Sequence, residues 1–219
     1  MIRVRAGAAC AVLITLVPQP AASQGGGRWT AFGGIGFLEE RVDASFGLEK
    51  FSGLALEFGV TARVSSRLAV DARGLGAELP AASAEDLDRR VGEAEALARY
   101  RLASVWGLYG GVTVRSISND AGGQHWVVGR VGAEVRPAFS GGRLHAIGRF
   151  GLIPLASVKG LSSAAITFDG AVGFAYEHDR INLSLLYGVE QFAFTDAGDV
   201  DRKEQMSRLM LRGGIRLPR

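Results

Sequence analysis

The sequence predicts an all-β protein, a closed antiparallel up-and-down barrel of about ten strands. The first reason is a period of two in hydropathy, which is most regular in "LALEFGVTARV", where Leu54, Leu56 and Phe58 alternate with Ala55 and Glu57. Successive side chains leave a strand on opposite faces, so this period is typical of strands. The second reason is that the connections between such segments are alternately short and long. Together these patterns favour consecutive hairpins.

Length and composition agree with one folded domain. The chain has 219 residues, of which 47% are hydrophobic and 21% are charged, so we do not expect a disordered protein. Past the N-terminus, no stretch approaches the roughly 20 consecutive apolar residues that a spanning helix needs.

The N-terminal segment has the pattern of a secretory signal peptide. Arg3 and Arg5 precede the apolar run "AGAACAVLITLVP", and the small residues "AAS" end at Ser23. We expect residues 1–23 to be cleaved and residues 24–219 to form a single barrel domain. A single anchoring helix is the alternative, but Pro18 and Pro20 interrupt it.

Removal of this segment changes two properties of the chain. The only cysteine, Cys10, precedes most of the apolar run, so we expect neither lipidation nor a disulfide in the mature protein. Loss of Arg3 and Arg5 leaves 23 basic residues against 22 acidic ones. The net charge then gives no reason to expect a nucleic-acid partner.

The alternation predicts ten strands, each close to the length of about 9 to 11 residues that a tilted membrane strand requires. They are Arg28 to Glu39, Gly53 to Val64, Arg67 to Leu79, Val91 to Leu102, Trp106 to Ser118, His125 to Phe139, Arg143 to Leu155, Ala164 to Tyr176, Ile181 to Phe194 and Glu204 to Leu217.

Connections of two sizes separate these strands. Short turns are expected at 65–66, 103–104, 140–142 and 178–180, and longer polar loops at 40–52, 80–90, 119–124, 159–163 and 195–203. Val42 to Phe51 also alternates weakly, so it could extend the first two strands or form another. An even number returns both termini to one side, as in bacterial single-chain barrels, and eight or twelve strands remain open.

The charged residues of the strands fall on one face. In a membrane barrel this face would surround the lumen and the apolar face would meet lipid, whereas a soluble barrel would be inverted. Arginine predominates over lysine there, and its planar fork suits paired, desolvated carboxylates. We therefore expect a transmembrane barrel whose lumen is lined by Glu57, Arg63, Asp71, Arg73, Glu93, Glu95, Arg99, Arg101, Arg115, Arg130, Glu134, Arg136, Arg149, Asp169, Glu190, Arg208 and Arg212.

Aromatic residues gather beside the short turns. Rings of this kind collect at the headgroup level of a membrane. The predicted girdle is Trp29, Tyr100, Trp106, Phe139 and Tyr176. At the other rim the candidates, of open facing, are Phe37, Trp126, Phe192 and Phe194.

From residue 28 to the end, the chain resembles the bacterial outer-membrane β-barrel superfamily in its small single-chain members. The resemblance implies location in the outer membrane of a diderm bacterium, contact with membrane lipid and lipopolysaccharide, and insertion by the outer-membrane assembly machinery. No short motif indicates a subfamily. The family's last strand usually ends in an aromatic residue, whereas this chain ends Leu217-Pro218-Arg219.

No motif predicts catalysis. A nucleophilic site needs Ser, His and an orienting acid within reach, and a metal site needs converging ligands. The three histidines are His125, His145 and His178. Only His125 is placed at the loop side, where Asp120, Asp196, Asp199 and Asp201 could accompany it, as acids and a histidine do in the ten-stranded outer-membrane proteases that the chain resembles in strand number.

The sequence is interpreted as a non-enzymatic barrel with a charged, largely plugged lumen, no metal and no cofactor. Its role would be structural or interactive, or that of a pore for small solutes. One alternative is a soluble exported lipocalin-like barrel that binds an apolar ligand, with Leu56, Phe58, Val131, Phe150 and Phe168 inside and Arg130 outside. Another is a hydrolase with its site at the outer mouth. The oligomeric state is not predicted.

Overall fold

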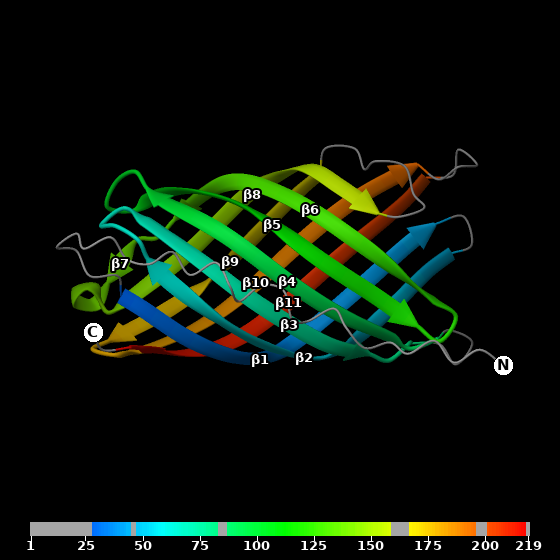
Figure 1. Ribbon diagram of the computed structural model, residues 1–219, viewed down its shortest axis with the longest axis horizontal. Coiled ribbons are helices and arrows are strands. Elements are labelled where there is room, and N and C mark those ends of the chain that lie inside the picture. Colours follow the sequence, from blue (N-terminus) through cyan, green and yellow to red (C-terminus); the bar gives the residue numbers. More distant parts are fainter. Residues whose placement is uncertain (1–27, 45–46, 83–86, 159–166, 196–200, 218–219) are drawn as a thin grey trace.

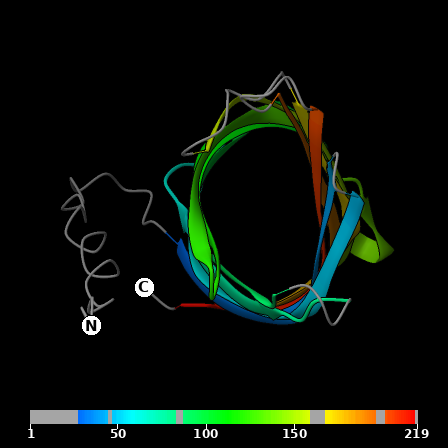
Figure 2. The ribbon, with the colours of Figure 1, turned by 90° about the vertical axis from the view of Figure 1, so that its right-hand side faces the viewer.

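Ten long strands close into a barrel. The computed structural model describes residues 28–44, 47–82, 87–158, 167–195 and 201–217, so the predicted signal peptide at residues 1–23 lies outside the described residues. Figures 1 and 2 show the barrel from the side and from one end. The elements are β1 (Arg28–Ala44), β2 (Gly47–Arg63), β3 (Leu68–Leu79), β4 (Arg89–Arg101), β5 (Trp106–Asn119), β6 (Gly122–Val135), β7 (Ala138–Phe139), the 3₁₀ turn η1 (Ser140–Gly142), β8 (Leu144–Val158), β9 (Thr167–His178), β10 (Ile181–Thr195) and β11 (Asp201–Arg216).

The sheet is antiparallel and has no free long edge. Each long strand pairs with its neighbour in sequence, except that β6 pairs with β8 past the two-residue β7, and β1 pairs with β11. The second of these pairings runs from Thr30 opposite Arg216 to Asp43 opposite Lys203. The prediction of a closed, ten-stranded, up-and-down barrel is confirmed. No helix among the described residues is long and apolar enough to cross a membrane.

The outer face of the barrel is apolar. In β2, Leu54, Leu56 and Phe58 are exposed, whereas Ala55 and Glu57 between them are buried. Every barrel strand contributes at least one exposed large apolar side chain, among them Ile35, Phe58, Val70, Tyr100, Val112, Val131, Phe150, Val172, Leu185 and Leu211.

The inverted, lipocalin-like arrangement is wrong. It requires five apolar side chains inside, but Leu56, Phe58, Val131, Phe150 and Phe168 are 45 to 70% exposed. It also requires Arg130 outside, and this side chain is buried. The reason is that the pairing register keeps the same face of every strand turned toward the lumen. Since the charged residues of each strand are on this inner face, the alternating apolar residues are on the outer face.

The largest departure from the predicted strands is at the loop end. Residues 40–44 and 47–52 were predicted as loop but belong to β1 and β2. Apart from Leu48 and Ser52, their outward side chains are charged, with Arg41 and Lys50 both paired to Glu39. Since these charges end the apolar band, the two strands continue past it, which agrees with the weak alternation from Val42 to Phe51.

Smaller corrections concern other ends of strands. The predicted strand from His125 to Phe139 begins at Gly122 and ends at Val135, and the predicted loop at 119–124 shrinks to residues 120–121. Asn119 accounts for the tight turn, because its side-chain oxygen accepts hydrogen bonds from the backbone N–H groups of Ala121 and Gly122 at 3.0 and 2.9 Å. The predicted loops at 159–163 and 195–203 fall largely outside the described residues.

Candidate functional site

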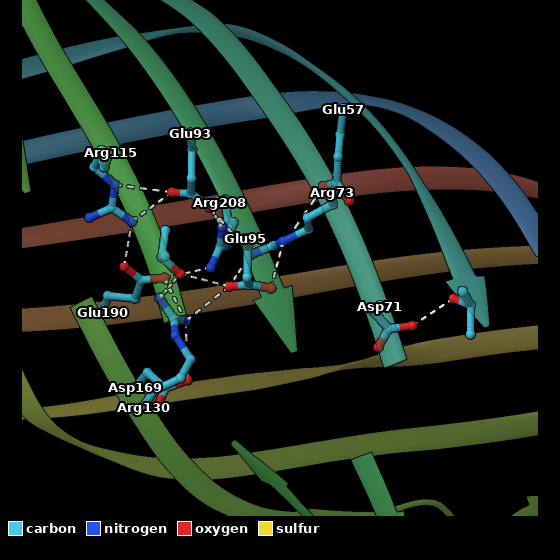
Figure 3. Close-up of polar contacts among 12 residues, drawn as sticks. Glu57, Asp71, Arg73, Glu93, Glu95, Arg115, Arg130, Asp169, Glu190 and Arg208 are labelled. Carbon is cyan, nitrogen blue, oxygen red and sulfur yellow. Dashed lines mark hydrogen bonds and ion pairs between the residues drawn. The ribbon is translucent and has the colours of Figure 1, made fainter. Parts of the chain in front are cut away.

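A network of ion pairs crosses the middle of the lumen (Figure 3). It joins five carboxylates to five guanidinium groups, so its formal charge is balanced. The members, called the central network below, are Glu57, Glu93, Glu95, Asp169, Glu190, Arg73, Arg115, Arg130, Arg208 and Arg212.

Arg115 links opposite parts of the barrel wall. From β5 it donates to Glu93 of β4 at 2.7 Å and to Glu190 of β10 at 2.6 Å. The side chain is 1% exposed. Strands β5 and β10 are not neighbours in the sheet, so this contact bridges the lumen rather than following the wall.

Three arginines converge on Glu190, as many as on Glu93. Arg130 of β6 reaches Glu190 at 3.1 Å, and Arg208 of β11 at 2.5 Å, in addition to Arg115. Arg130 also donates to the hydroxyl of Thr113 at 3.0 Å, and that hydroxyl donates to Glu95 at 3.0 Å. Charge-assisted hydrogen bonds of this kind satisfy buried groups that water does not reach.

Two glycines let a tyrosine enter the network. The hydroxyl of Tyr109 in β5 donates to Asp169 of β9 at 3.2 Å. To do so the ring crosses β6 and β8, where a Cβ on Gly132 or Gly151 would collide with it. These two glycines face each other in the β6–β8 pairing. A bare backbone there allows the close approach.

Toward the loop end the lumen is apolar. Trp126 makes edge-to-face contacts with Phe192 and Phe194, at centroid distances of 5.1 and 5.3 Å. Arg115 lies 6.0 Å from the rings of Trp126 and Phe192, so this apolar layer meets the central network directly. Other members of the layer are Leu38, Phe51, Ala55, Leu75, Leu79, Val91, Ile117, Val128, Ile153, Ala156, Val158, Met206 and Met210. The possibility that Trp126, Phe192 and Phe194 form an outer girdle is therefore wrong, whereas Phe37 is exposed outside.

Two buried acids lie beside the apolar layer, beyond the level of the apolar outer band. Glu40 is paired with Arg89 at 3.0 Å and Glu204 with Arg202 at 2.5 Å. Burial outweighs these arginines and raises the pKa of both acids, that of Glu204 to about 7, with repulsion from Glu40 acting in the same direction.

Toward the turn end the ion pairs are smaller and partly exposed. Asp71 pairs with Arg99 at 2.6 Å, and Glu134 pairs with Arg149 at 2.5 Å. Arg136 is paired with Glu177. These pairs lie between the central network and an open cavity at the turn end that is lined by Arg63, Arg99, Arg101, Glu134 and Arg136 among others.

The residues predicted to line the lumen occupy three environments. Seven are buried: Glu57, Glu93, Glu95, Arg115, Arg130, Asp169 and Glu190. Eight are half-buried: Asp71, Arg73, Arg99, Glu134, Arg136, Arg149, Arg208 and Arg212. Arg63 and Arg101 are exposed at the turn end. Glu134 pairs with Arg149, which lies directly opposite it in the β6–β8 pairing.

The five predicted girdle residues are all exposed at the turn end. Trp29, Tyr100, Trp106, Phe139 and Tyr176 have exposed fractions of 41 to 54%. Their position at a membrane interface stays a prediction.

The histidines are not brought together. His125 is exposed and shares the outward parity of Val127, on the opposite face from the buried Trp126. His178 lies at the turn end with Nδ1 3.3 Å from Asp179, and His145 lines the cavity there. Asp196 and Asp199 lie outside the described residues. Within the described part of the chain, no group of three or more His, Cys, Asp or Glu residues is arranged to hold a metal ion.

Sequence reasoning missed several residues that complete these clusters. Tyr109 and Thr113 carry a polar group on the inner face but are neither acids nor bases, and Glu40 and Arg89 lie where loop was expected. Strict alternation continued past Phe37 would have placed Glu40 inside, since it shares the parity of Leu38 and Val42, both buried.

No protein-family model and no curated protein matches the chain. Solved structures do. The outer membrane protease OmpT from Escherichia coli superposes with a TM-score of 0.59, at 9% identity over 87% of this chain and 97% of that one. An outer membrane channel from Pseudomonas putida F1 (TM-score 0.47, 12% identity, 91% and 100% covered) and the translocator domain of the autotransporter NalP from Neisseria meningitidis (0.46, 13%, 89% and 90%) are also similar. At 9% identity, the likeness to OmpT shows the fold alone, that of a closed antiparallel β-barrel.

Proposed function

We propose that this chain is an integral outer-membrane β-barrel of a diderm, Gram-negative bacterium whose lumen is closed by its own side chains, and that it acts as a structural or interaction protein rather than as an open channel. The apolar outer face supports the membrane location, because a soluble barrel would not leave so many large apolar side chains in water. The fold likeness supports the outer membrane in particular.

The observation that carries the closed lumen is the bridge made by Arg115 between Glu93 and Glu190. A ten-stranded barrel is narrow, since wide aqueous channels need about 16 strands. The cavity left among the charges of the central network measures about 50 Å³, which is room for a few water molecules only. The apolar layer around Trp126 lies next to this cavity, toward the loop end of the barrel. Two layers of opposite chemistry thus oppose the passage of both ions and apolar solutes.

The proposed partners follow from this location. Membrane lipid would cover the apolar band, and lipopolysaccharide of the outer leaflet would contact the barrel at its loop end. The assembly machinery would insert the barrel. Charged outward residues such as Glu39, Arg41 and Lys50 lie at the end of the apolar band, where polar headgroups would reach them.

A non-catalytic role is part of the proposal. It is supported by the outward position of His125, which leaves no histidine among the described residues at the loop end facing the lumen. If hydrolysis of a peptide or lipid substrate by the purified barrel were found and were abolished by His125→Ala, this part of the proposal would be refuted.

The membrane location is tested by electrophoresis. The purified mature chain should require detergent for solubility, and its unboiled band should migrate faster than the boiled one, as expected of a compact barrel. A monodisperse protein in plain buffer would contradict the membrane location.

The closed lumen is tested by conductance in planar lipid bilayers. The wild-type barrel should show no steady conductance, whereas Arg115→Ala combined with Trp126→Ala should conduct because both layers lose their central side chain. Arg130→Ala with Glu134→Ala removes one member of the central network and the turn-end pair with Arg149 but leaves the apolar layer intact, so it should raise conductance less. Arg90→Ala, at an exposed arginine of the loop end, is the control. Steady conductance by the folded wild type would refute closure.

A further inference from the structure

The turn end of the barrel contains a second cavity that the closed lumen does not explain. Its volume is about 270 Å³, and it opens at the end opposite to the apolar layer. Five arginines line it: Arg63, Arg67, Arg99, Arg101 and Arg136. Among the described residues, two acids belong to the lining, Glu134 and Glu177. The lining therefore carries a formal charge of +3 with His145 neutral.

The acids of this region are already engaged. Glu134 accepts from Arg149 at 2.5 Å, and Glu177 is paired with Arg136 and lies 3.7 Å from Arg216. Asp71, behind the lining, holds Arg99 through two contacts of 2.6 and 2.8 Å. Among the described residues of the lining, Arg67 and Arg101 are not engaged by these acids.

Arg67 and Arg101 take part in no ion pair among the described residues. Arg101 is held in place by the backbone carbonyl of Ser66, to which it donates. A guanidinium group has five N–H donors in a planar fork, so this one contact leaves several donors of Arg101 for another acceptor. Both arginines come from neighbouring turns, after β2 and at the end of β4, and the backbone N–H of Arg101 donates to the carbonyl of Arg67 at 2.8 Å.

Hydroxyl groups add further donors to the cavity. Ser65, Ser66 and Ser104 belong to the lining. The Oγ of Ser65 accepts hydrogen bonds from the backbone N–H groups of Arg67 and Leu68 at 3.2 and 3.0 Å, which fixes the turn and leaves its hydroxyl hydrogen to donate. A cavity rich in guanidinium and hydroxyl donors suits an anion with several acceptor oxygens.

We propose that this cavity is a binding site for a phosphoryl group, either of a small soluble phosphate or of a phospholipid headgroup. Arg67 and Arg101 make the principal contacts, because Arg99 and Arg136 are engaged by carboxylates. The cavity is smaller than the range of about 300 to 1,000 Å³ typical of drug-sized ligands, so it takes a small anion. A dianion would offset most of the excess charge.

The test is isothermal titration calorimetry of inorganic phosphate into the folded barrel in non-ionic detergent, at constant ionic strength set by chloride. Wild-type protein should bind phosphate saturably, and Arg67→Ala with Arg101→Ala should weaken the affinity at least tenfold. Arg90→Ala removes an exposed arginine at the other end and should leave the affinity unchanged. Faster migration of the unboiled band verifies that each variant is folded.

Two results would overturn the proposal: absence of saturable binding by the wild type, or equal affinities of the wild type and the double variant. The source of the phosphoryl group is decided in nanodiscs. Weaker phosphate binding in phosphatidylcholine nanodiscs than in the non-ionic detergent, which carries no phosphoryl group, supports the headgroup, and equal binding in both supports a soluble phosphate. Because calorimetry does not depend on conductance, a wild-type barrel that conducts but binds phosphate would refute only the closed lumen.

Discussion

Replacement of Arg115 by methionine should destabilise the barrel by about 3 kcal/mol. Removal of one partner of a buried ion pair typically costs about 3 to 5 kcal/mol, because a charge is left uncompensated in a medium of low polarity. In the central network five carboxylates would then face four guanidinium groups. Each orphaned acid keeps two arginines, with Arg208 at 3.0 Å from Glu93 and at 2.5 Å from Glu190, so the lower end of the range applies.

The assay is urea unfolding of the barrel in phospholipid vesicles, followed by tryptophan fluorescence. Arg90→Met is the matched control, since its pair with Glu78 is exposed and 4.0 Å long, and such surface pairs contribute at most about 1 kcal/mol. Arg115→Met with Glu93→Gln removes one charge of each sign and restores the balance. The double variant should therefore lose at least about 1 kcal/mol less than the two single variants added together. Strict additivity, or equal stabilities of Arg115→Met and Arg90→Met, would refute the reasoning.

Three further predictions use the same unfolding assay. Gly151→Ala should cost about 1 to 3 kcal/mol, because its methyl group would displace the Tyr109 hydroxyl from Asp169, and a cost below about 0.5 kcal/mol would mean that the ring moves aside freely. The folded pKa of Glu204 is raised from 4.5 to about 7, so the stabilising effect of this residue is complete below about pH 4.5 and is lost as the pH rises through 7. Glu204→Gln should therefore be more stable than the wild type by up to about 3 kcal/mol at pH 8 and equally stable at pH 4. A stability difference that is independent of pH would contradict this. Phe58→Arg, in the apolar band, should cost about 2 to 4 kcal/mol, whereas Leu48→Arg on the same face of β2 near Lys50 should cost about 1 kcal/mol or less; equal costs would place the band elsewhere.

Much of the fold could be predicted because one physical rule governs it. The period of two assigns each residue of a strand to one of two faces, and a barrel needs only consecutive hairpins to close. Strand number, antiparallel order and the position of the short turns followed from this rule. It failed at residues 40–52, where charge on the outer face suggested a loop although Val42 and Phe51 on the inner face are buried. The charged side chains on the outer face of residues 40–52 mark the end of the apolar band, and the strands continue beyond it.

The candidate site was less accessible to the same reasoning. The alternation indicates that Arg115 and Glu190 share the inner side, but these residues are 75 positions apart in the chain, and no local pattern relates them. Likewise, Trp126 is an aromatic residue at a strand end, and only its burial against Phe192 and Phe194 shows that it fills the lumen.

The strands, their order and the side of the sheet to which most charges belong could be predicted from the sequence, because these depend on neighbours within a strand and between consecutive strands. The three-dimensional arrangement was needed to show which charges meet, where the apolar layer lies and that Arg67 and Arg101 have no acid partner among the described residues at an open cavity. The physical reason is that strand tilt and stagger set the depth of each side chain along the barrel axis. Contacts across the lumen depend on that depth, and the alternation of hydropathy along a strand does not predict it.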